Sequence, residues 1–380
     1  MDSSLFLKPS PLNAENYAEG TLGNKVLFAP DAEDSEIVIV GVAEDRNSDN
    51  LGCAEAPDAV RKYLYRLSAP VKNLKIVDIG NIIAGETPQD TYVAVEQVLE
   101  ELLKKDKTVL LLGGSNDLMF PAYKAYQNLE RTINMTSVDN QFDIGQPEEE
   151  LHNKSYFTHI ILNQPNFLFN YSVLAYQTHF VKQEEIKLMN QLFFDTLRLG
   201  TIYQNILQAE PYIRNSDIVG VDISSVRLSD APGNKNATPN GLYGEQLCQI
   251  ARFAGISDKV SLFGLFEINP QLDNSHEQTA HLGAQTFWYF IEGYYKRQKD
   301  FPLTPKKNYL KYIVNISEDY EIVFYKSPSS MKWWMEVPYP VNLKTKYERH
   351  HMVPCTYEDY QTASQGEVPE RWWKSYKKLL

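Results

Sequence analysis

The sequence has few of the side chains and segments on which several classes of protein depend. Its 380 residues include only three cysteines and seven histidines. Because Cys53, Cys248 and Cys355 stand in unrelated contexts, we expect free thiols and a cytoplasmic location rather than a disulfide framework. No apolar run approaches the roughly 20 residues of a membrane-spanning helix. The first residues also lack the basic start and apolar core of a secretory signal.

Other absences exclude particular chemistries. The chain has no Gly-x-Ser-x-Gly elbow, no phosphate-binding P-loop, no Cys-x-x-Cys pair and no Gly-x-Gly-x-x-Gly stretch after a predicted strand. Its net charge of −12 argues against nonspecific nucleic-acid binding, because neutralising phosphates requires a basic surface. No internal repeat or low-complexity segment is present. The composition is that of an ordinary folded protein.

Short apolar runs alternate with helical patterns along most of the chain. The runs that predict buried strands cover residues 37–42, 74–80, 108–114, 133–139, 158–163, 217–224 and 260–269. They are apolar throughout, as expected of parallel strands covered on both faces. Helical spacing of apolar residues is found over 56–67, 91–105, 245–255 and 276–295. This alternation predicts an α/β fold with a mainly parallel sheet of about eight strands between helices. Functional residues then gather at the carboxyl ends of the strands.

Residues 326–380 differ in composition from residues 1–325. They hold four of the five tryptophans, as the pairs Trp333-Trp334 and Trp372-Trp373, and nine Lys or Arg against six Asp or Glu. We interpret residues 1–325 as one α/β domain and residues 326–380 as a basic, aromatic C-terminal tail. Such a tail either folds back on its own domain or binds a protein partner. In the second case Trp333, Trp334, Trp372 and Trp373 are the expected contact residues, because Trp often anchors interfaces.

Polar residues collect where four of the predicted strands end. They are Gly113-Gly114-Ser115-Asn116-Asp117, Asp139 to Asp143, Asp222 to Ser224, and Glu267 followed by Asn269-Pro270. With Gly41, Asp45, Gly52, Pro57, Ala59 and Arg61 upstream, these segments resemble the arginase–agmatinase–formimidoylglutamase family of ureohydrolases. The resemblance covers residues 36–297 and is nearest to the formimidoylglutamase branch. It implies the arginase-like, three-layer α/β/α fold for residues 1–325.

The resemblance also implies a metal site. Members of the family hold two Mn²⁺ ions, whose shared hydroxide attacks the carbon of a guanidinium or amidine. At the positions of the six usual ligands this sequence has Asn116, Asp139, Gln141, Asp143, Asp222 and Ser224. Three carboxylates are retained, whereas both imidazoles and one carboxylate are replaced. The oxygen donors that remain suit Mg²⁺, Ca²⁺ or Mn²⁺. From this degenerate site we expect no cofactor, or at most one weakly held Mg, Ca or Mn ion.

The retained carboxylates need a compensating charge. Two carboxylates about 4 Å apart repel each other by about 4 kcal/mol at an effective dielectric constant near 20. Arg227 and Lys235 stand where the family usually has an Asp and small residues. We predict that one of these two side chains reaches the carboxylates in place of a metal. Of the two, Arg227 is the preferred candidate. The alternative for each is a solvated loop charge.

Two further residues match active-site positions of the family. His152 corresponds to its active-site His, and Glu267 to the acid that grips the cationic end of the substrate. We expect no catalytic residue in this chain and interpret both as vestigial. His152 is then structural or exposed. Glu267 either caps the following loop, pairs with a basic residue, or still grips a guanidino or amidino ligand.

Three functions are compatible with these residues. The leading interpretation is a pseudoenzyme that acts as a binding or scaffold subunit of a larger assembly, with a protein partner on the C-terminal tail. The first alternative is a formimidoylglutamase-like hydrolase of a linear amidine C–N bond, with a single ion at Asp139, Asp143 and Asp222. The second is a sensor of a guanidino or amidino metabolite. The sequence is also compatible with a homo-oligomer. We expect neither nucleic-acid binding nor a membrane-spanning segment.

Overall fold

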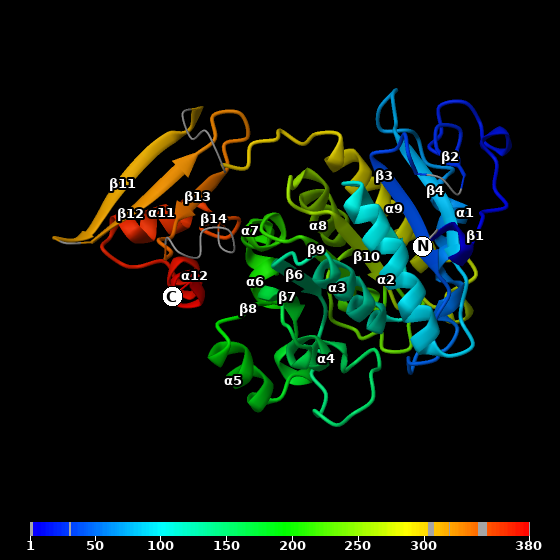
Figure 1. Ribbon diagram of the computed structural model, residues 1–380, viewed down its shortest axis with the longest axis horizontal. Helices are drawn as coiled ribbons and strands as arrows, with labels where there is room; N and C mark the ends of the chain where they lie inside the picture. Colours follow the sequence, from blue (N-terminus) through cyan, green and yellow to red (C-terminus); the bar gives the residue numbers. More distant parts are fainter. Residues whose placement is uncertain (1–2, 30–31, 303–307, 319, 341–347, 380) are drawn as a thin grey trace.

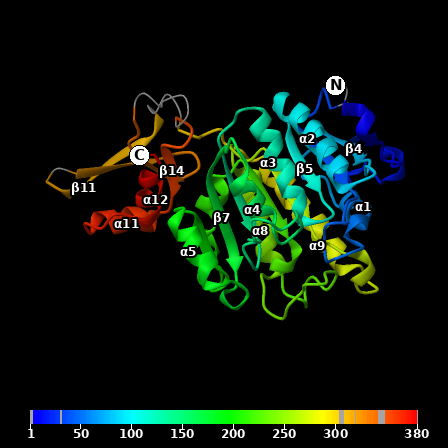
Figure 2. The same cartoon turned by 60° about the horizontal axis from the view of Figure 1, so that its bottom comes forward.

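The computed structural model describes residues 3–29, 32–302, 308–318, 320–340 and 348–379. An α/β body holds most of them, and a smaller C-terminal module (β11–β14, α11 and α12) lies beside it (Figure 1). Figure 2 shows the same separation from a second direction, with the N-terminal strands at the far end of the body.

A ten-stranded sheet forms the centre of the body. Its strands are β1 (Leu7–Lys8), β2 (Leu27–Phe28), β3 (Ile37–Val42), β4 (Ile76–Ile82), β5 (Thr108–Leu112), β6 (Ile133–Val138), β7 (Leu168–Tyr176), β8 (Asp195–Arg198), β9 (Ile218–Asp222) and β10 (Leu262–Phe266). The order across the sheet is β1-β4-β3-β5-β10-β9-β6-β7-β8, with β2 paired to β4. Every pairing except β1 with β4 is parallel. The predicted α/β fold with a mainly parallel sheet is therefore confirmed.

Helices cover both faces of this sheet. They are α1 (Ala56–Leu64), α2 (Pro88–Lys104), α3 (Met119–Asn128), α4 (Tyr156–Leu162), α5 (Gln183–Gln191), α6 (Leu199–Gln204), α7 (Glu210–Arg214), α8 (Gly244–Ile256) and α9 (Gln278–Tyr294). Short 3-10 helices span Ser3–Phe6, Ala14–Asn16, Cys53–Glu55, Asn116–Leu118, Thr178–Phe180, Ile206–Gln208, Ile223–Ser225 and Pro270–Leu272. Among the described residues, none of the helices combines the length and the hydropathy that crossing a membrane requires.

The strands are apolar throughout because each contributes to two cores. Ile37 and Ile39 of β3 pack into the core under α1, α8 and α9. Val38 and Val40 of the same strand pack into the core under α2, α3 and α4. Successive side chains of a strand point to opposite faces, so a strand between two helical layers needs apolar residues at every position. This arrangement gives the three layers predicted from the sequence.

One predicted strand is a helix. Residues 158–163, a short apolar run, lie in and just after α4, which buries Tyr156, Phe157 and Ile160 against the sheet. A short buried helix and a buried strand have the same composition, and periodicity alone cannot distinguish them. The parallel strand beside β6 is instead β7, whose residues Leu168–Tyr176 were not predicted as a strand.

The C-terminal module has its own sheet and its own core. Antiparallel strands β11 (Leu310–Ser317), β12 (Tyr320–Lys326), β13 (Trp333–Glu336) and β14 (Met352–Cys355) are joined in that order. Helices α11 (Tyr357–Ser364) and α12 (Glu370–Leu379) follow them. The predicted boundary between residues 325 and 326 falls inside β12. It missed β11 because the charge and Trp content of the chain change only after that strand.

Three of the four tail tryptophans are not available to a partner. Trp333 is 7% exposed, Trp334 is 1% exposed and Trp372 is 2% exposed. Trp333 and Trp372 belong to the core of the module, and the Arg214 guanidinium of the body lies 4.6 Å from the ring centre of Trp334. The prediction of these three as partner-binding residues is wrong, because they stabilise the module and its contact with the body. Trp373, 46% exposed, stays a prediction.

Candidate active site

Four strand ends meet at one edge of the central sheet. Strands β5, β10, β9 and β6 are parallel neighbours in that order, so the residues that follow them lie side by side. These residues are Asn116 after β5, Glu267 after β10, Asp222 at the end of β9 and Asp139 after β6. The predicted ligand positions therefore gather in one place.

Direct contacts join most of these positions. The Asn116 Nδ2 donates to Asp143 Oδ2 at 3.1 Å and to Asp139 Oδ2 at 3.4 Å. The Gln141 Nε2 donates to Asp143 Oδ1 at 3.1 Å. At the end of β9, the Ser224 backbone N–H donates to Asp222 Oδ1 at 2.7 Å.

The three carboxylates are buried together without a cation in contact. Burial, followed by the charges of Asp143 and Asp222, raises the pKa of Asp139 well above its usual range. Burial and the Asp222 charge raise the pKa of Asp143 to about 7, and burial raises that of Asp222 to about 6. Among the described residues, none forms an ion pair with any of the three. The cluster therefore carries an uncompensated negative charge that favours a proton or a metal cation.

The two predicted replacement cations point elsewhere. The Arg227 Nε donates to Asp230 Oδ1 at 2.8 Å, and its guanidinium lies 3.8 Å from the ring centre of Tyr243. The Lys235 Nζ donates to the Asp49 carbonyl oxygen at 2.7 Å. The prediction that one of them neutralises the carboxylates is wrong, because Arg227 pairs with Asp230 in its own loop and Lys235 donates to Asp49 in the loop after β3.

A different lysine acts on the cluster. The positive charge of Lys154 lowers the pKa of both Asp143 and Asp222, against the larger effect of burial. Its Nζ lies 2.8 Å from Asp49 Oδ2 and 3.1 Å from Asn236 Oδ1. Reasoning from the sequence missed these three residues. The sequence gives little indication of their role, since the only notable feature is that Lys154 follows His152 by two residues.

His152 lies at the surface of the same loop. Its side chain is 33% exposed, and its Nε2 is 2.7 Å from Glu149 Oε1. Its Nδ1 accepts a hydrogen bond from the Lys154 backbone N–H at 3.1 Å. These contacts order the turn that carries Lys154.

Glu267 is a fully buried anchor. Its carboxylate accepts hydrogen bonds from Ser48 Oγ at 3.1 Å, from Asn50 Nδ2 at 3.0 Å and from the Asn116 backbone N–H at 2.9 Å. Burial and the Asp222 charge raise its pKa. The side chain thus joins the end of β5 to the loop after β3. Protein donors thus already occupy this carboxylate. That Glu267 also grips a ligand stays a prediction.

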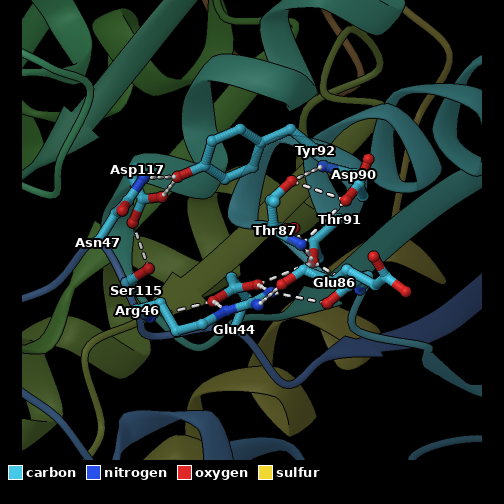
Figure 3. Close-up of polar contacts among 11 residues, drawn as sticks. Glu44, Arg46, Asn47, Glu86, Thr87, Asp90, Thr91, Tyr92, Ser115 and Asp117 are labelled. Atoms are coloured by element: carbon cyan, nitrogen blue, oxygen red, sulfur yellow. Dashed lines mark hydrogen bonds and ion pairs between the residues drawn. The ribbon is translucent and has the colours of Figure 1, made fainter.

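A second polar layer supports the end of β5 (Figure 3). Asp117 accepts hydrogen bonds from Ser115 Oγ and from the hydroxyl of Tyr92 at the start of α2. Asn47 Nδ2 donates to the Tyr92 hydroxyl at 2.7 Å. Burial raises the pKa of Asp117 to about 6. The layer fixes the turn that carries Asn116.

The donors present fit a manganese site made of oxygen ligands. Within the described residues, no three His, Cys, Asp or Glu side chains converge closely enough to hold a metal ion by themselves. Amide and hydroxyl oxygens of Asn116, Gln141 and Ser224 are therefore needed to complete any coordination. Carboxylate and carbonyl oxygens suit Mn²⁺, Mg²⁺ and Ca²⁺. The amide nitrogens of Asn116 and Gln141 donate to Asp143, and rotation of either amide group would turn its oxygen toward the cluster.

The chain is similar to known proteins of one family. The model of the arginase family matches residues 35–292, which end before the C-terminal module begins. A formimidoylglutamase of Staphylococcus aureus is 26% identical over 274 residues, which are 68% of this chain and 86% of that protein.

Two solved structures share the fold. A Trypanosoma cruzi formiminoglutamase described with Mn²⁺₂ has a TM-score of 0.65 at 19% identity and covers 71% of this chain and 96% of its own. A Bacillus subtilis formimidoylglutamase has a TM-score of 0.67 at 20% identity and covers 78% of this chain and 99% of its own.

The manganese pair in the Trypanosoma cruzi protein overturns one expectation. The prediction of no cofactor, or of at most one weakly held Mg, Ca or Mn ion, is wrong. It relied on the loss of imidazole ligands and gave too little weight to the buried carboxylates that remain.

Proposed function

Because this chain belongs to the arginase family, we propose that it is a manganese-dependent hydrolase of a C–N bond in linear amidines, similar to formimidoylglutamase. The similarity to the Staphylococcus aureus formimidoylglutamase supports this function over that of a scaffold. It was the first alternative inferred from the sequence, where a pseudoenzyme was the leading interpretation.

The observation that carries the proposal is the burial of Asp139, Asp143 and Asp222 at adjacent strand ends, where the Asp222 charge raises the pKa of the other two. All three are buried, and no described cation contacts them. A structural carboxylate is normally paired when it is buried, since an isolated buried charge is costly. A cluster of three carboxylates without a cationic partner among the described residues is therefore suited to a bound cation.

In the proposed reaction, the metal and the residues of the chain have different roles. Manganese bound here supplies a positive charge that polarises the amidine and lowers the pKa of a water molecule used as the nucleophile. Asp139, Asp143 and Asp222 hold that charge, with oxygens of Asn116, Gln141 and Ser224 as further donors. Hydrolysis of a formimidoyl amine consumes one water and releases formamide and the free amine.

Metal content and turnover test the proposal together. Protein reconstituted with Mn²⁺ and desalted is expected to retain manganese by mass spectrometry and to release glutamate from formimidoylglutamate. Asp143→Ala should lower both the manganese content and the turnover, the turnover by about 100-fold or more, since even indirect support of a metal ligand is worth about 10- to 100-fold. Asp106→Ala, at a side chain that is 90% exposed, is the matched control.

Other outcomes decide between the alternatives. A protein that retains no manganese and hydrolyses no amidine would contradict the proposal and favour the scaffold function. Saturable binding of an amidine without turnover would favour a sensor. We also infer a cytoplasmic location, supported by three cysteines that are all buried and unpaired.

A further inference from the structure

Lys154 ties together three loops around the carboxylate cluster. It lies between β6 and α4, and its ammonium contacts Asp49 in the loop after β3 and Asn236 in the loop after β9. Asn153 Nδ2 and Asn236 Nδ2 also donate to Asp49 Oδ1, at 3.0 and 3.2 Å. One exposed ion pair is thus held in place by amides from two loops.

The charges around the site are layered. The inner layer is negative, because Asp139, Asp143 and Asp222 are buried. The outer layer holds two ammonium groups: that of Lys154 pairs with the Asp49 carboxylate, and that of Lys235 donates to the Asp49 backbone carbonyl oxygen. The Lys154 side chain is 36% exposed, so its ammonium faces the solvent, whereas Asp139, Asp143 and Asp222 lie deeper in the molecule.

A substrate that matches both layers carries opposite charges at its two ends. The amidine end is cationic or neutral and belongs with the inner carboxylates and the metal. An ammonium at the rim favours an anion at the other end of the same molecule. The ammonium would repel a cationic tail and would give a neutral tail no charge attraction.

We propose that Lys154 determines substrate specificity by binding the carboxylate of an amidino or guanidino acid. Asp49 holds the ammonium in place before the substrate arrives, and the substrate carboxylate replaces Asp49 as its partner. Asn236, already within hydrogen-bonding distance of the ammonium, keeps it aligned. This inference rests on the proposed function, because it assigns the far end of the same substrate.

Two ligands of matched length test it by calorimetry on the full-length, manganese-loaded protein. 4-Guanidinobutyrate ends in a carboxylate, and agmatine ends in an ammonium on the same four-carbon scaffold. Wild-type protein is expected to bind the acid more tightly. Lys154→Met should weaken binding of the acid by about tenfold or more, as expected for the loss of a charge-assisted hydrogen bond, without weakening agmatine.

Further variants separate a specificity role from a structural one. Lys154→Arg should retain most of the preference for the acid. Asp49→Asn should tighten binding of the acid several-fold, because it removes the competing carboxylate and keeps an acceptor for the two amides. Lys182→Met, at a lysine that is 73% exposed on the N-terminal side of α5, is the control and should change neither affinity.

Equal weakening of both ligands by Lys154→Met would overturn the inference, because it would indicate a structural role. Unchanged preference in that variant, or no preference in the wild type, would overturn it too. Turnover of formimidoylglutamate is measured separately. Selective binding without turnover refutes the proposed hydrolysis and supports the Lys154 assignment, whereas turnover without charge selectivity does the opposite.

Discussion

Two residues of the candidate site adopt a backbone conformation that non-glycine residues rarely use. Asp143 has φ 53° and Glu267 has φ 65°, both in the left-handed region. Such residues cost about 1 to 3 kcal/mol each and persist only where their surroundings hold them. For Glu267 the surroundings are the hydrogen bonds from Ser48, Asn50 and Asn116.

Removing this anchor should be costly. Glu267→Ala removes the acceptor of the Asn116 N–H, of the Ser48 hydroxyl and of one of the two Asn50 amide hydrogen bonds. We therefore expect a loss of about 2 to 4 kcal/mol in the free energy of unfolding. Glu277→Ala is the control, since Glu277 also has a positive φ of 50° but a side chain that is 39% exposed. Its loss should stay below about 1 kcal/mol. Urea unfolding of both variants measures the difference, and equal losses would contradict the anchoring role.

Asp117 gives a prediction about pH. Its pKa of about 6 in the folded protein exceeds the ordinary value of 3.8, so the folded state holds the proton more tightly than the unfolded state. The stabilisation from this proton is full below pH 3.8 and is lost as the pH rises to about 6. Over that pH range, the free energy of unfolding of the wild type should fall by up to about 3 kcal/mol more than that of Asp117→Asn, because one pKa unit corresponds to about 1.4 kcal/mol. Urea unfolding at several pH values measures this difference, and parallel pH dependences of the two proteins would contradict the raised pKa of Asp117.

At the scale of single elements, α12 shows how a helix separates two neighbouring tryptophans. Adjacent residues of an α-helix point about 100° apart, because a turn takes about 3.6 residues. Trp372 therefore faces the core of the module, where its Nε1 donates to the Glu336 carbonyl oxygen at 3.0 Å. Trp373 faces solvent and lies 4.6 Å from the Lys377 ammonium.

The two tryptophans should respond differently to truncation of the side chain. Trp372→Ala creates a cavity and leaves the Glu336 carbonyl without this donor, so it should destabilise the module by about 3 to 5 kcal/mol. Trp373→Ala should change the unfolding free energy by about 0.5 kcal/mol or less. Guanidinium unfolding followed by Trp fluorescence tests this, and a harmless Trp372→Ala would restore the interpretation of the pair as a partner site.

At the scale of the whole molecule, charge holds the C-terminal module against the body. Arg349 Nη2 lies 2.7 Å from Asp217 Oδ1, and Lys374 Nζ lies 3.5 Å from Asp195 Oδ1. The Arg371 guanidinium lies 3.8 Å from the ring centre of Tyr212. These contacts explain the basic composition of residues 326–380, which meet an acidic surface of their own chain.

The position of the module boundary predicts the result of two truncations. Deleting residues 326–380 leaves β11 and most of β12 without β13, which exposes Ile322 and Phe324 and should cause aggregation. Deleting residues 308–380 removes the module as a unit and should leave a monodisperse, less stable body. Size-exclusion chromatography with light scattering distinguishes them. Identical behaviour of the two proteins would contradict a module that begins near Leu310.

How much the sequence predicted depends on the range of the interactions involved. The buried strands β3, β5, β9 and β10 and the helices α1, α2, α8 and α9 follow from local apolar periodicity, and all were predicted. The β7 strand was missed and α4 was predicted as a strand, because sheet pairing overrides the local preference of a short apolar segment. The partners of Arg227, Lys235 and Lys154 depend on how loops distant in sequence meet, which periodicity does not describe.

The sequence by itself determined the layered α/β architecture and the edge of the sheet where polar residues collect, because both depend on the alternation of apolar segments and on residues adjacent to them. Only the tertiary structure decided which cation lies near the carboxylates, which tryptophans are buried and where the C-terminal module begins. Those features depend on contacts between segments that are far apart in the chain, and each side chain takes the nearest available partner in three dimensions.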